Sequence, residues 1–348
     1  MLLVNNPGSW AHVYPPLRHA EWHGVTPTDL IFPFFLFIVG VSLAYSLGRR
    51  GLAGASRREL LEKILRRGLV IIVVGLLLNG FPHYDLATLR WPGVLQRIGL
   101  VYLLAAPAWL LLSSTGVCLL VLVLLVGYWG LMTLVPVPGY GPGVLEPIGN
   151  LAQYLDARLL AGHTWKPGWD PEGVLSTLPA VATCLIGAIT GRWLRAQPMA
   201  PRVSWTLTGA GLLLLSLGLG WSLGFPLNKS LWTSSYVLVT AGAALLALAA
   251  CVGLIDVGSR PRWAEPWLPF GTNPLLVFVG SGVMARCLTL WRVGEAPASV
   301  PIQRVIYEEV FASWAGPLPG SLAYAIAFLL VWMAIANGLN RMGWRIRA

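Results

Sequence analysis

Two histidines and two carboxylates stand directly before an apolar run that is long enough to cross a membrane. They lie in "LRHAEWHGVTPTDLIFPFFLFIVG", residues 17–40, and include His19, His23 and Asp29. Histidine titrates near neutral pH, and a neighbouring carboxylate can fix its tautomer, so this combination suits proton transfer. Asp29 also has a structural interpretation, because it occupies the third position of a helix that would begin at Pro27 and could cap it.

His19 and His23 are four residues apart, which is the spacing at which two metal ligands share one face of a helix. The segment also contains Pro15, Pro16 and Gly24, which oppose a regular helix, and no third ligand is evident. The residues therefore favour a proton-handling histidine, and we expect no bound metal.

The composition is that of an integral membrane protein. Of the 348 residues, 56% are hydrophobic and 11% are charged, and the mean hydropathy is +0.69. Apolar runs near the ~20 residues that span a bilayer occur at 30–48, 67–82, 94–113, 116–136, 174–194, 204–223, 233–255, 268–287 and 321–340. These nine runs predict an all-α, polytopic transmembrane helix bundle that forms one domain over residues 1–348. The opening "MLLV" resembles the end of a further helix, so we expect a missing N-terminal span and a truncated chain.

The distribution of Lys and Arg predicts the orientation of the bundle. Residues 49–67 contain seven basic residues, and positively charged loops stay in the cytoplasm. Strict alternation places 192–202, 257–262 and the C-terminal tail on the same side. It places all five histidines on the extracytoplasmic side, where we expect the chemistry. The net charge of +10 matches anionic lipid at the inner face and gives little reason to invoke nucleic acid.

Further polar residues lie near the outer ends of the predicted spans. Gln96 and Arg97 fall about one turn inside a span, where an unpaired charge is costly. Arg97 should face the bundle and pair with Asp29 or Glu172, unless its side chain extends to the lipid headgroups. The other candidates of this kind are Asn228, Lys229 and Asn273.

Six ordered motifs resemble those of one known family. They are "LLVNNPGSW", "LRHAEWHGVTPTDLIFPFFLFIVGVS", "RWPGVLQRIGLVYLL", "DPEGVLSTLPAVATCLIGAITG", "FPLNKSLWTSSYVL" and "FGTNPLLVFVG". Together they cover nearly the whole chain and resemble, in order, the heparan-alpha-glucosaminide N-acetyltransferase family and its bacterial relatives.

The resemblance implies a membrane enzyme that moves acetyl from cytosolic acetyl-CoA, its co-substrate, to a glucosamine amine on the far side. Its active histidine corresponds to His19 in "HAEW", and its asparagine and aspartate correspond to Asn5 and Asp29. His23 falls where the lysosomal enzyme has asparagine, so it is the weaker candidate.

We expect the acceptor, an amino sugar or envelope glycan, to meet the outer polar groups, and the phosphates of CoA to meet inner arginines. The expected acceptor-binding residues are Trp22, Gln96, Arg97, Asp170, Glu172, Asn228, Lys229 and Asn273. The expected CoA-binding residues are Arg66, Arg67 and Arg192. The expected location is a bacterial inner membrane, in contact with lipid, and self-association into a homo-oligomer is left open.

A transporter or permease is the alternative function. In that class His19, Asp29 and Arg97 would form a proton relay or a gate. The alternative predicts polar groups near the middle of the membrane, whereas the sequence gathers them at the outer ends of the spans.

Overall fold

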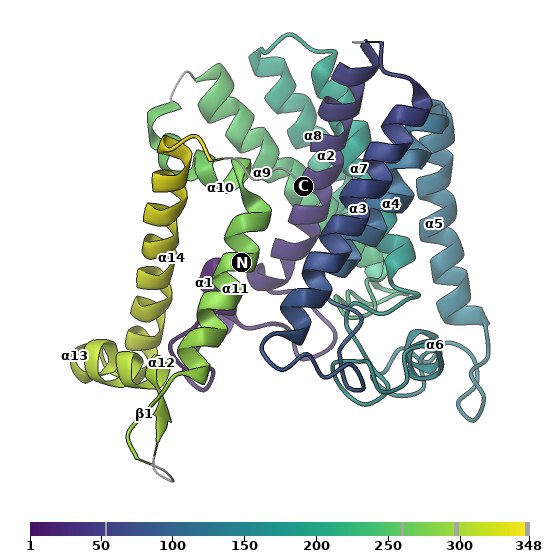
Figure 1. Ribbon diagram of the computed structural model, residues 1–348. Helices are drawn as coiled ribbons and strands as arrows, with labels where there is room; N and C mark the ends of the chain where they lie inside the picture. The colour runs from purple at the N-terminus through teal and green to yellow at the C-terminus, as the bar shows by residue number, and fades with distance from the viewer. Residues whose placement is uncertain (53, 259–260, 296–298, 345–348) are drawn as a thin grey trace. The chain divides into compact units, whose positions relative to one another are not determined.

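The computed structural model describes residues 1–52, 54–258, 261–295 and 299–344 (Figure 1). Residues 259–260 and 345–348 belong to segments that we predicted on the cytoplasmic side, and they lie outside the described residues. The described chain is mostly helical, with one pair of two-residue strands, which confirms the predicted all-α bundle. Its contacts form two compact units. The prediction of a single domain over 1–348 stays a prediction.

The larger unit comprises Ala20–Val25 and Asp29–Ser259. A 3-10 turn at Pro27–Leu30, which begins in the smaller unit, leads into its first long helix. Its helices are α2 (Ile31–Leu52), α3 (Arg57–Gly80), α4 (Val94–Leu111), α5 (Ser114–Leu134), α6 (Leu151–Leu159), α7 (Thr177–Arg195), α8 (Pro201–Ser222) and α9 (Ser234–Cys251), which continues as a π-helical turn at Val252–Val257.

The smaller unit comprises Met1–His19, Thr26–Thr28 and Arg260–Ala348. Its helices are α1 (Leu2–Asn5), α10 (Leu268–Thr272), α11 (Pro274–Leu290), α12 (Ile302–Val305), α13 (Ser313–Ala315) and α14 (Pro317–Arg341), with 3-10 turns at Pro15–Leu17, Pro261–Trp263 and Glu265–Trp267 and a π-helical segment at Ile306–Ala312. Strands β1 (Arg292–Val293) and β2 (Val300–Pro301) pair antiparallel.

Seven helices among the described residues are long and apolar enough to cross a membrane. They match seven of the nine predicted runs. The run at 268–287 is instead broken into α10 and α11, which meet at 86°. The run at 67–82 is the apolar end of α3, whose charged first half excludes it from the seven.

The basic segment 49–67 is mostly helix, although we predicted a loop. Helix α2 continues to Leu52, and α3 begins at Arg57. The Oγ of Ser56 accepts a hydrogen bond from the Glu59 backbone N–H at 3.3 Å, which caps the start of α3. A Ser-x-x-Glu box therefore starts a helix where charge alone indicated a loop.

Helices α2 and α7 pack with their backbones almost in contact. A Cβ added at Gly40 would lie 1.9 Å from the carbonyl oxygen of Cys184, and one added at Gly187 would lie 2.0 Å from that of Phe37. Glycine on both helices permits this approach, as is typical of helix pairs in membranes. The contacts advance in the same direction along both helices, so α2 and α7 are parallel and begin at the same end.

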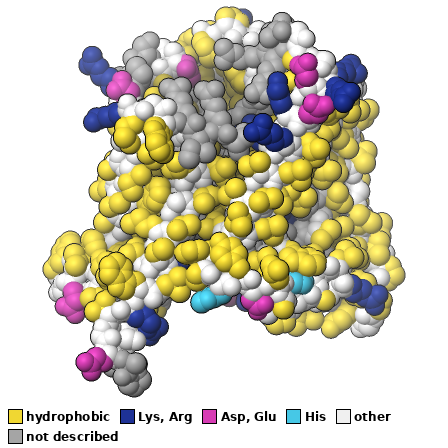
Figure 2. Space-filling model, in the orientation of Figure 1, with side chains coloured by type: hydrophobic (Ala, Val, Ile, Leu, Met, Phe, Trp, Pro, Cys, Tyr) yellow, Lys and Arg dark blue, Asp and Glu magenta, His cyan; other side chains and the backbone are white. Residues whose placement is uncertain are grey.

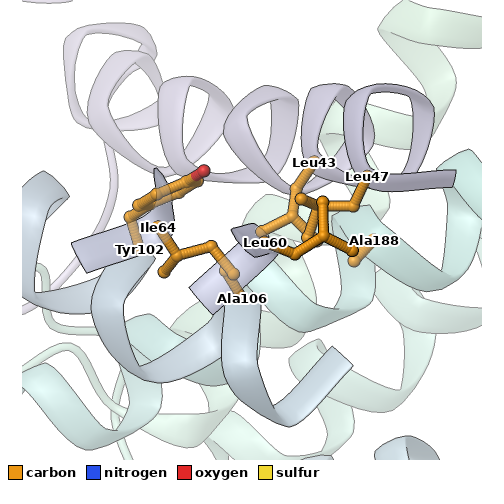
Figure 3. Packing of buried hydrophobic residues seen from close by; sticks show 7 residues of the cluster. All are labelled: Leu43, Leu47, Leu60, Ile64, Tyr102, Ala106 and Ala188. Atoms are coloured by element: carbon orange, nitrogen blue, oxygen red, sulfur yellow. The ribbon is translucent and has the colours of Figure 1, made fainter. Parts of the chain in front are cut away.

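A cluster of buried apolar side chains fixes α3 and α4 against this pair (Figure 3). It contains Leu43, Leu47, Leu60, Ile64, Tyr102, Ala106 and Ala188. Helices α3 and α4 are antiparallel, because Gly68 meets Leu103 while Gly75 meets Gln96. Helix α4 therefore begins at the same end of the unit as α2 and α7.

The two ends of the larger unit differ in charge. Two of the seven basic residues of 49–67 lie in the last turn of α2, and the other five lie in the first part of α3. Arg192 and Arg195 end α7 at that same end, where Arg195 donates to the Ala44 carbonyl at 2.8 Å. His23, His83 and His163 lie in segments at the opposite end. Over these helices, Figure 2 shows a band of hydrophobic side chains, with Lys and Arg gathered beyond one edge and with His, together with some Lys and Arg, beyond the other. The basic residues and the histidines are thus separated along the helices, and which end faces the cytoplasm stays a prediction.

The α2–α7 contact gives a prediction about stability. Gly40→Ala should destabilise the fold by at least about 1–3 kcal/mol, because its methyl group overlaps a backbone atom that cannot move aside. Gly209→Ala, on α8, is the matched control, since nothing lies within 4 Å of its added Cβ. The measurement is the unfolding midpoint of each variant in detergent. Equal midpoints for the two variants would contradict the close contact.

Candidate functional site

Four helices of the larger unit begin at the same end, and a charged residue lies at or next to the start of each. Asp29 precedes α2, Arg97 is the fourth residue of α4, Glu172 precedes α7, and Lys229 precedes α9. Helix α9 begins at this end because α8 and α9 are antiparallel. The candidate site is therefore built at helix starts, where unpaired backbone N–H groups create a positive potential.

Asp29 is held at the centre of this group. Its side chain is buried, and Oδ2 accepts a hydrogen bond from the backbone N–H of Ala20 at 3.0 Å. Oδ1 lies 3.4 Å from Nζ of Lys229. The hydroxyl of Tyr236, on α9, donates to the backbone carbonyl of Asp29 at 2.6 Å. Asp29 thus connects the start of α2 with the start of α9. This role differs from that of a residue that only caps its own helix.

Lys229 is largely buried beside Asp29. Burial lowers its pKa from the ordinary value, while the negative charges of Asp29 and Glu172 act in the opposite direction. Burial therefore disfavours the ammonium form of Lys229, and these two carboxylates favour it.

Asn228 fixes the segment that follows His19. Its Nδ2 donates to the Trp22 carbonyl at 3.0 Å and lies 3.3 Å from Nδ1 of His23. Its Oδ1 accepts from the Leu231 N–H at 2.8 Å, and the Gly24 N–H donates to the Leu227 carbonyl at 2.8 Å. Because its amide is occupied in this way, Asn228 positions the 22–24 segment.

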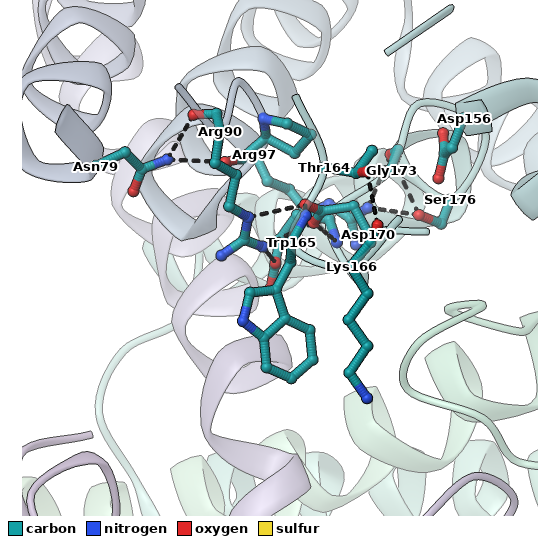
Figure 4. A network of polar contacts seen from close by, with 12 residues as sticks. Asn79, Arg90, Arg97, Asp156, Thr164, Trp165, Lys166, Asp170, Gly173 and Ser176 are labelled. Carbon is teal, nitrogen blue, oxygen red and sulfur yellow. Dashed lines mark hydrogen bonds and ion pairs between the residues drawn. The ribbon is translucent and has the colours of Figure 1, made fainter. Parts of the chain in front are cut away.

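A second cluster forms around Arg90 (Figure 4). Its Nε and Nη2 donate to the two carboxylate oxygens of Asp170 at 2.8 and 2.7 Å, and Nη2 also lies 2.5 Å from Oε2 of Glu172. Such a bidentate pair is strong and directional. Asp170 accepts further bonds from the backbone N–H groups of Trp165 and Glu172, at 2.8 and 2.9 Å. This cluster fixes the loop that precedes α7.

Glu172 connects the two clusters electrostatically. Burial raises its pKa, and the neighbouring charges of Arg90, Arg97 and Lys229 oppose this rise. Lys229 in turn pairs with Asp29. Charges of alternating sign therefore extend from the start of α2 to the loop before α7.

Arg97 faces the bundle, as predicted, and only 1% of it is exposed. Its Nη2 donates to the Gly173 carbonyl at 2.9 Å and to the hydroxyl of Ser176. Its guanidinium carbon lies 5.2 Å from the centre of the Trp232 ring. Among the described residues, Nε and Nη1 have no hydrogen-bond partner.

The direct partners of Arg97 differ from the prediction. Within 4.0 Å, the described acids Asp29 and Glu172 pair with Lys229 and Arg90 instead. Arg90 pairs with Glu172 because Arg90 lies in a loop at the level of this acid. Arg97 lies one turn deeper along α4, and its side chain therefore reaches the Gly173 carbonyl instead.

Asp156, on α6, is a buried acid next to this turn. Its Oδ1 accepts from the Val174 N–H at 2.9 Å, and only 1% of the residue is exposed. Burial raises its pKa to about 6, although the Val174 N–H and Arg97 oppose the rise. A Cβ at Gly173 would lie 1.8 Å from Oδ2, so this glycine leaves room for the carboxylate.

Three predicted site residues belong to the smaller unit. Asn5 ends α1 and is exposed, His19 follows the 3-10 turn at Pro15–Leu17, and Asn273 is a buried residue at the break between α10 and α11. The chain links His19 directly to Ala20, whose N–H binds Asp29. Within the described residues, no three His, Cys, Asp or Glu side chains gather as a metal site.

The predicted CoA-binding arginines lie at the opposite, basic end of the larger unit. Arg66 and Arg67 are exposed on α3, and the guanidinium of Arg67 lies 5.2 Å from the centre of the Tyr102 ring. Arg192 donates to the hydroxyl of Ser114 at 2.5 Å and packs over Trp109, so it also joins α7 to α5.

Gln96 is buried on the other side of α4. Its amide oxygen lies near the Cα positions of Gly75 and Gly93, so it faces α3, away from Arg97. The structure therefore does not bring Gln96 together with the Asp29 and Arg97 groups.

Comparison with known proteins identifies the family. Residues 11–225 match the family described as heparan-alpha-glucosaminide N-acetyltransferase, catalytic. The chain belongs to this family. The matched range includes the charged groups at the starts of α2, α4 and α7.

Two curated relatives carry the name of the family. The heparan-alpha-glucosaminide N-acetyltransferase of Homo sapiens is 32% identical over 343 residues, which is 81% of this chain and 50% of the human protein. That of Mus musculus is 31% identical over 356 residues, which is 85% of this chain and 53% of the mouse protein. The chain thus spans about half the length of these relatives.

The structure adds four residues to the candidate site that the sequence did not predict: Arg90, Asp156, Ser176 and Tyr236. Asp156 could have been found, because it is an acid at apolar spacing in a helix whose other buried residues are Leu151 and Ala152. Arg90 lies in a loop, where sequence spacing gives no indication of contact with residues 80 positions away.

Arg97→Leu should lower the stability of this family member strongly. The change leaves the acids beside Gly173 with one cation fewer, and removing one member of a buried charge group costs roughly 3 kcal/mol or more. Arg202→Leu, at an exposed arginine on α8, should change stability by about 0.5 kcal/mol or less. Unfolding midpoints in detergent measure both. An Arg97→Leu variant as stable as the parent would show that the acids do not need this charge.

Asp156→Asn should flatten the pH dependence of stability. A pKa of about 6 means that the folded state binds the proton more tightly than the unfolded chain. In the parent, the contribution of Asp156 to the free energy of unfolding therefore falls as the pH rises from about 4 to about 6. Asn can still accept from Val174, so relative to the parent the variant should gain about 1 kcal/mol between pH 5 and pH 7.5. Parallel pH profiles of the two unfolding midpoints would contradict this.

Proposed function

We propose that the chain is a membrane-embedded acetyltransferase that moves acetyl from cytosolic acetyl-CoA to the amine of an amino sugar on the extracytoplasmic side. The main support is the family match over residues 11–225, which contains Asp29, Arg97 and Glu172. The names of the two relatives support a glucosamine-type acceptor. We place the protein in a bacterial inner membrane, with the histidine-bearing end of the larger unit outward.

The reaction requires a base and a donor for a developing negative charge. An amino sugar is mostly protonated at neutral pH, so the amine first loses a proton to the base. Its nitrogen then attacks the thioester carbon and an oxyanion forms. The C–S bond breaks as the CoA thiolate leaves, the nitrogen gives up its second proton to form the amide, and the thiolate takes up a proton. Hydrogen-bond donors near the carbonyl oxygen stabilise the intermediate.

In this proposal His19 is the base, and Asp29 keeps its imidazole in the active tautomer and favours its charged form. A covalent route, in which His19 first accepts the acetyl group, uses the same residues. Asn5 and the positive ends of α2, α4, α7 and α9 are the proposed oxyanion donors. Asn228 is a weaker donor than the sequence suggested, because its amide already binds the Trp22 carbonyl.

The acetyl donor would approach from the basic end. The ~30 Å hydrocarbon core is a distance that the extended pantetheine arm covers in good part. Arg66, Arg67 and Arg192 are the proposed phosphate ligands at that end.

The transporter alternative is less well supported. It expects charged groups near the middle of the spans, whereas Asp29, Arg97, Glu172 and Lys229 lie at or before helix starts. No further observation favours it.

The central prediction concerns His19. In proteoliposomes with acetyl-CoA on one face and glucosamine on the other, His19→Ala should abolish radiolabelled acetyl transfer and leave acetyl-CoA binding near normal. His23→Ala should keep substantial activity, because its ring is engaged with Asn228 and Glu146 in positioning. Undiminished transfer by the His19 variant would remove this residue from the chemistry. No transfer by the parent to any amino sugar would favour the transporter alternative.

Asp29→Asn tests the positioning role separately. If the carboxylate orients the imidazole, transfer should fall about a hundredfold or more. Lys229→Ala is the matched control, because it breaks the same ion pair but leaves the carboxylate in place. The comparison of transfer rates is made between variants of equal unfolding midpoint. Equal losses of transfer rate in Asp29→Asn and Lys229→Ala would mean that Asp29 acts only through its ion pair with Lys229, which would then be a structural contact.

A further inference from the structure

Three tryptophans of the larger unit form an aromatic platform at its histidine-bearing end. The ring centres of Trp22 and Trp169 are 5.9 Å apart, and those of Trp169 and Trp165 are 5.8 Å apart. Trp165 is 56% exposed at the outer end of this row, whereas Trp22 is partly buried at its base. We call these three residues the tryptophan platform.

The loop that presents the platform is rigidly built. The backbones of Lys166 and Trp169 exchange two hydrogen bonds, of 3.1 and 3.0 Å, around a Pro-Gly turn with Gly168 at φ 72°. The Trp165 N–H is fixed by buried Asp170, which Arg90 holds in turn. Figure 4 shows the side chains of Trp165 and Lys166 extending away from this polar network on the same side. The rings are thus preorganised, which reduces the entropy lost on binding a ligand.

The polar surroundings distinguish the platform from a membrane anchor. Tryptophans of an aromatic belt direct their rings separately at the lipid headgroups. Here the rings contact one another, and Nζ of Lys166 lies 5.1 and 5.8 Å from the ring centres of Trp165 and Trp169. At the other end of the row, His23 lies 3.8 Å from Glu146, whose side chain is 70% exposed. Hydroxyl-rich ligands match such a mixture of aromatic faces and charged donors and acceptors.

The platform is continuous with the candidate site. Trp22 contacts the ring of His23 at 6.1 Å, and its carbonyl accepts from Asn228, which directly precedes Lys229 of the Asp29 pair. Trp169 and Trp165 lie one and two ring contacts further out. A ligand stacked on them would extend toward the Asp29 group.

We propose that the tryptophan platform binds a pyranose ring of an oligosaccharide acceptor, namely the sugar that follows the amino sugar to be acetylated. This inference rests on the proposed function. The apolar face of the sugar stacks on Trp165, the tilted ring of Trp169 borders it, and Lys166 bonds its hydroxyl groups. The platform thereby selects chains over free monosaccharides.

The test compares a glucosamine tetrasaccharide with glucosamine as acceptors. Trp165→Ala should raise the KM for the tetrasaccharide about fivefold or more, because a stacked ring contributes on the order of such a factor. Its kcat, and both constants for glucosamine, should stay as in the parent. Trp205→Ala is the matched control, since Trp205 is 75% exposed on α8, away from the platform. Equal KM values for the tetrasaccharide in the parent and the Trp165 variant would overturn the proposal.

A binding measurement separates this proposal from the proposed function. The fully N-acetylated tetrasaccharide cannot accept acetyl, and it should quench the tryptophan fluorescence of the parent but quench the Trp165 variant much less. Quenching without any acetyl transfer would support the platform while the proposed function fails. Transfer to the tetrasaccharide with no quenching, together with reduced bilayer insertion of the Trp165 variant, would identify a membrane anchor and overturn the platform.

Discussion

The charges at the starts of α2, α4, α7 and α9 depend on one another, because Asp29 and Arg97 are buried and their surroundings offer far less solvation than bulk water. Asp29 pairs with Lys229, and Glu172 and Asp170 pair with Arg90. A single buried charge without its partner costs several kcal/mol, so the position of each helix start depends on the others. This mutual dependence explains why the loops before α7 and α9 are ordered although they contain no long helix of their own.

The close approach of α2 and α7 makes this arrangement geometrically possible. Both helices begin at the same end because they are parallel, and glycines such as Gly40 and Gly187 let their backbones meet. The start of α2 supplies Asp29, and the turn before α7 supplies the Gly173 carbonyl that Arg97 binds. A larger residue at Gly40 would separate the helices and therefore act on the polar group some turns away.

Sequence alone could predict those parts of the fold that depend on apolar periodicity and on quoted motifs. The spans followed from the periodicity, and the motifs singled out Asp29 and Lys229 as candidates, whose roles stay predictions. The partner of Arg97 could not be predicted, because Arg90 and Arg97 are equally suitable cations and only the folded loop decides which one meets Glu172. The extent of α3 was also wrong, since its charges suggested a loop while the Ser56 cap starts a helix.

The helix starts also bear on the chemistry of the proposed acetyl transfer. The attacked carbonyl gains negative charge while the amine loses positive charge, so the site must favour an anion without repelling the cationic acceptor. Four converging helix starts provide a positive potential through fixed backbone dipoles, which need no reorganisation during the reaction. The buried carboxylates next to them attract the ammonium form of the amine before it is deprotonated. The site combines helix dipoles with paired side chains and carries no large net charge. It can therefore first accept an ammonium group and then stabilise an oxyanion.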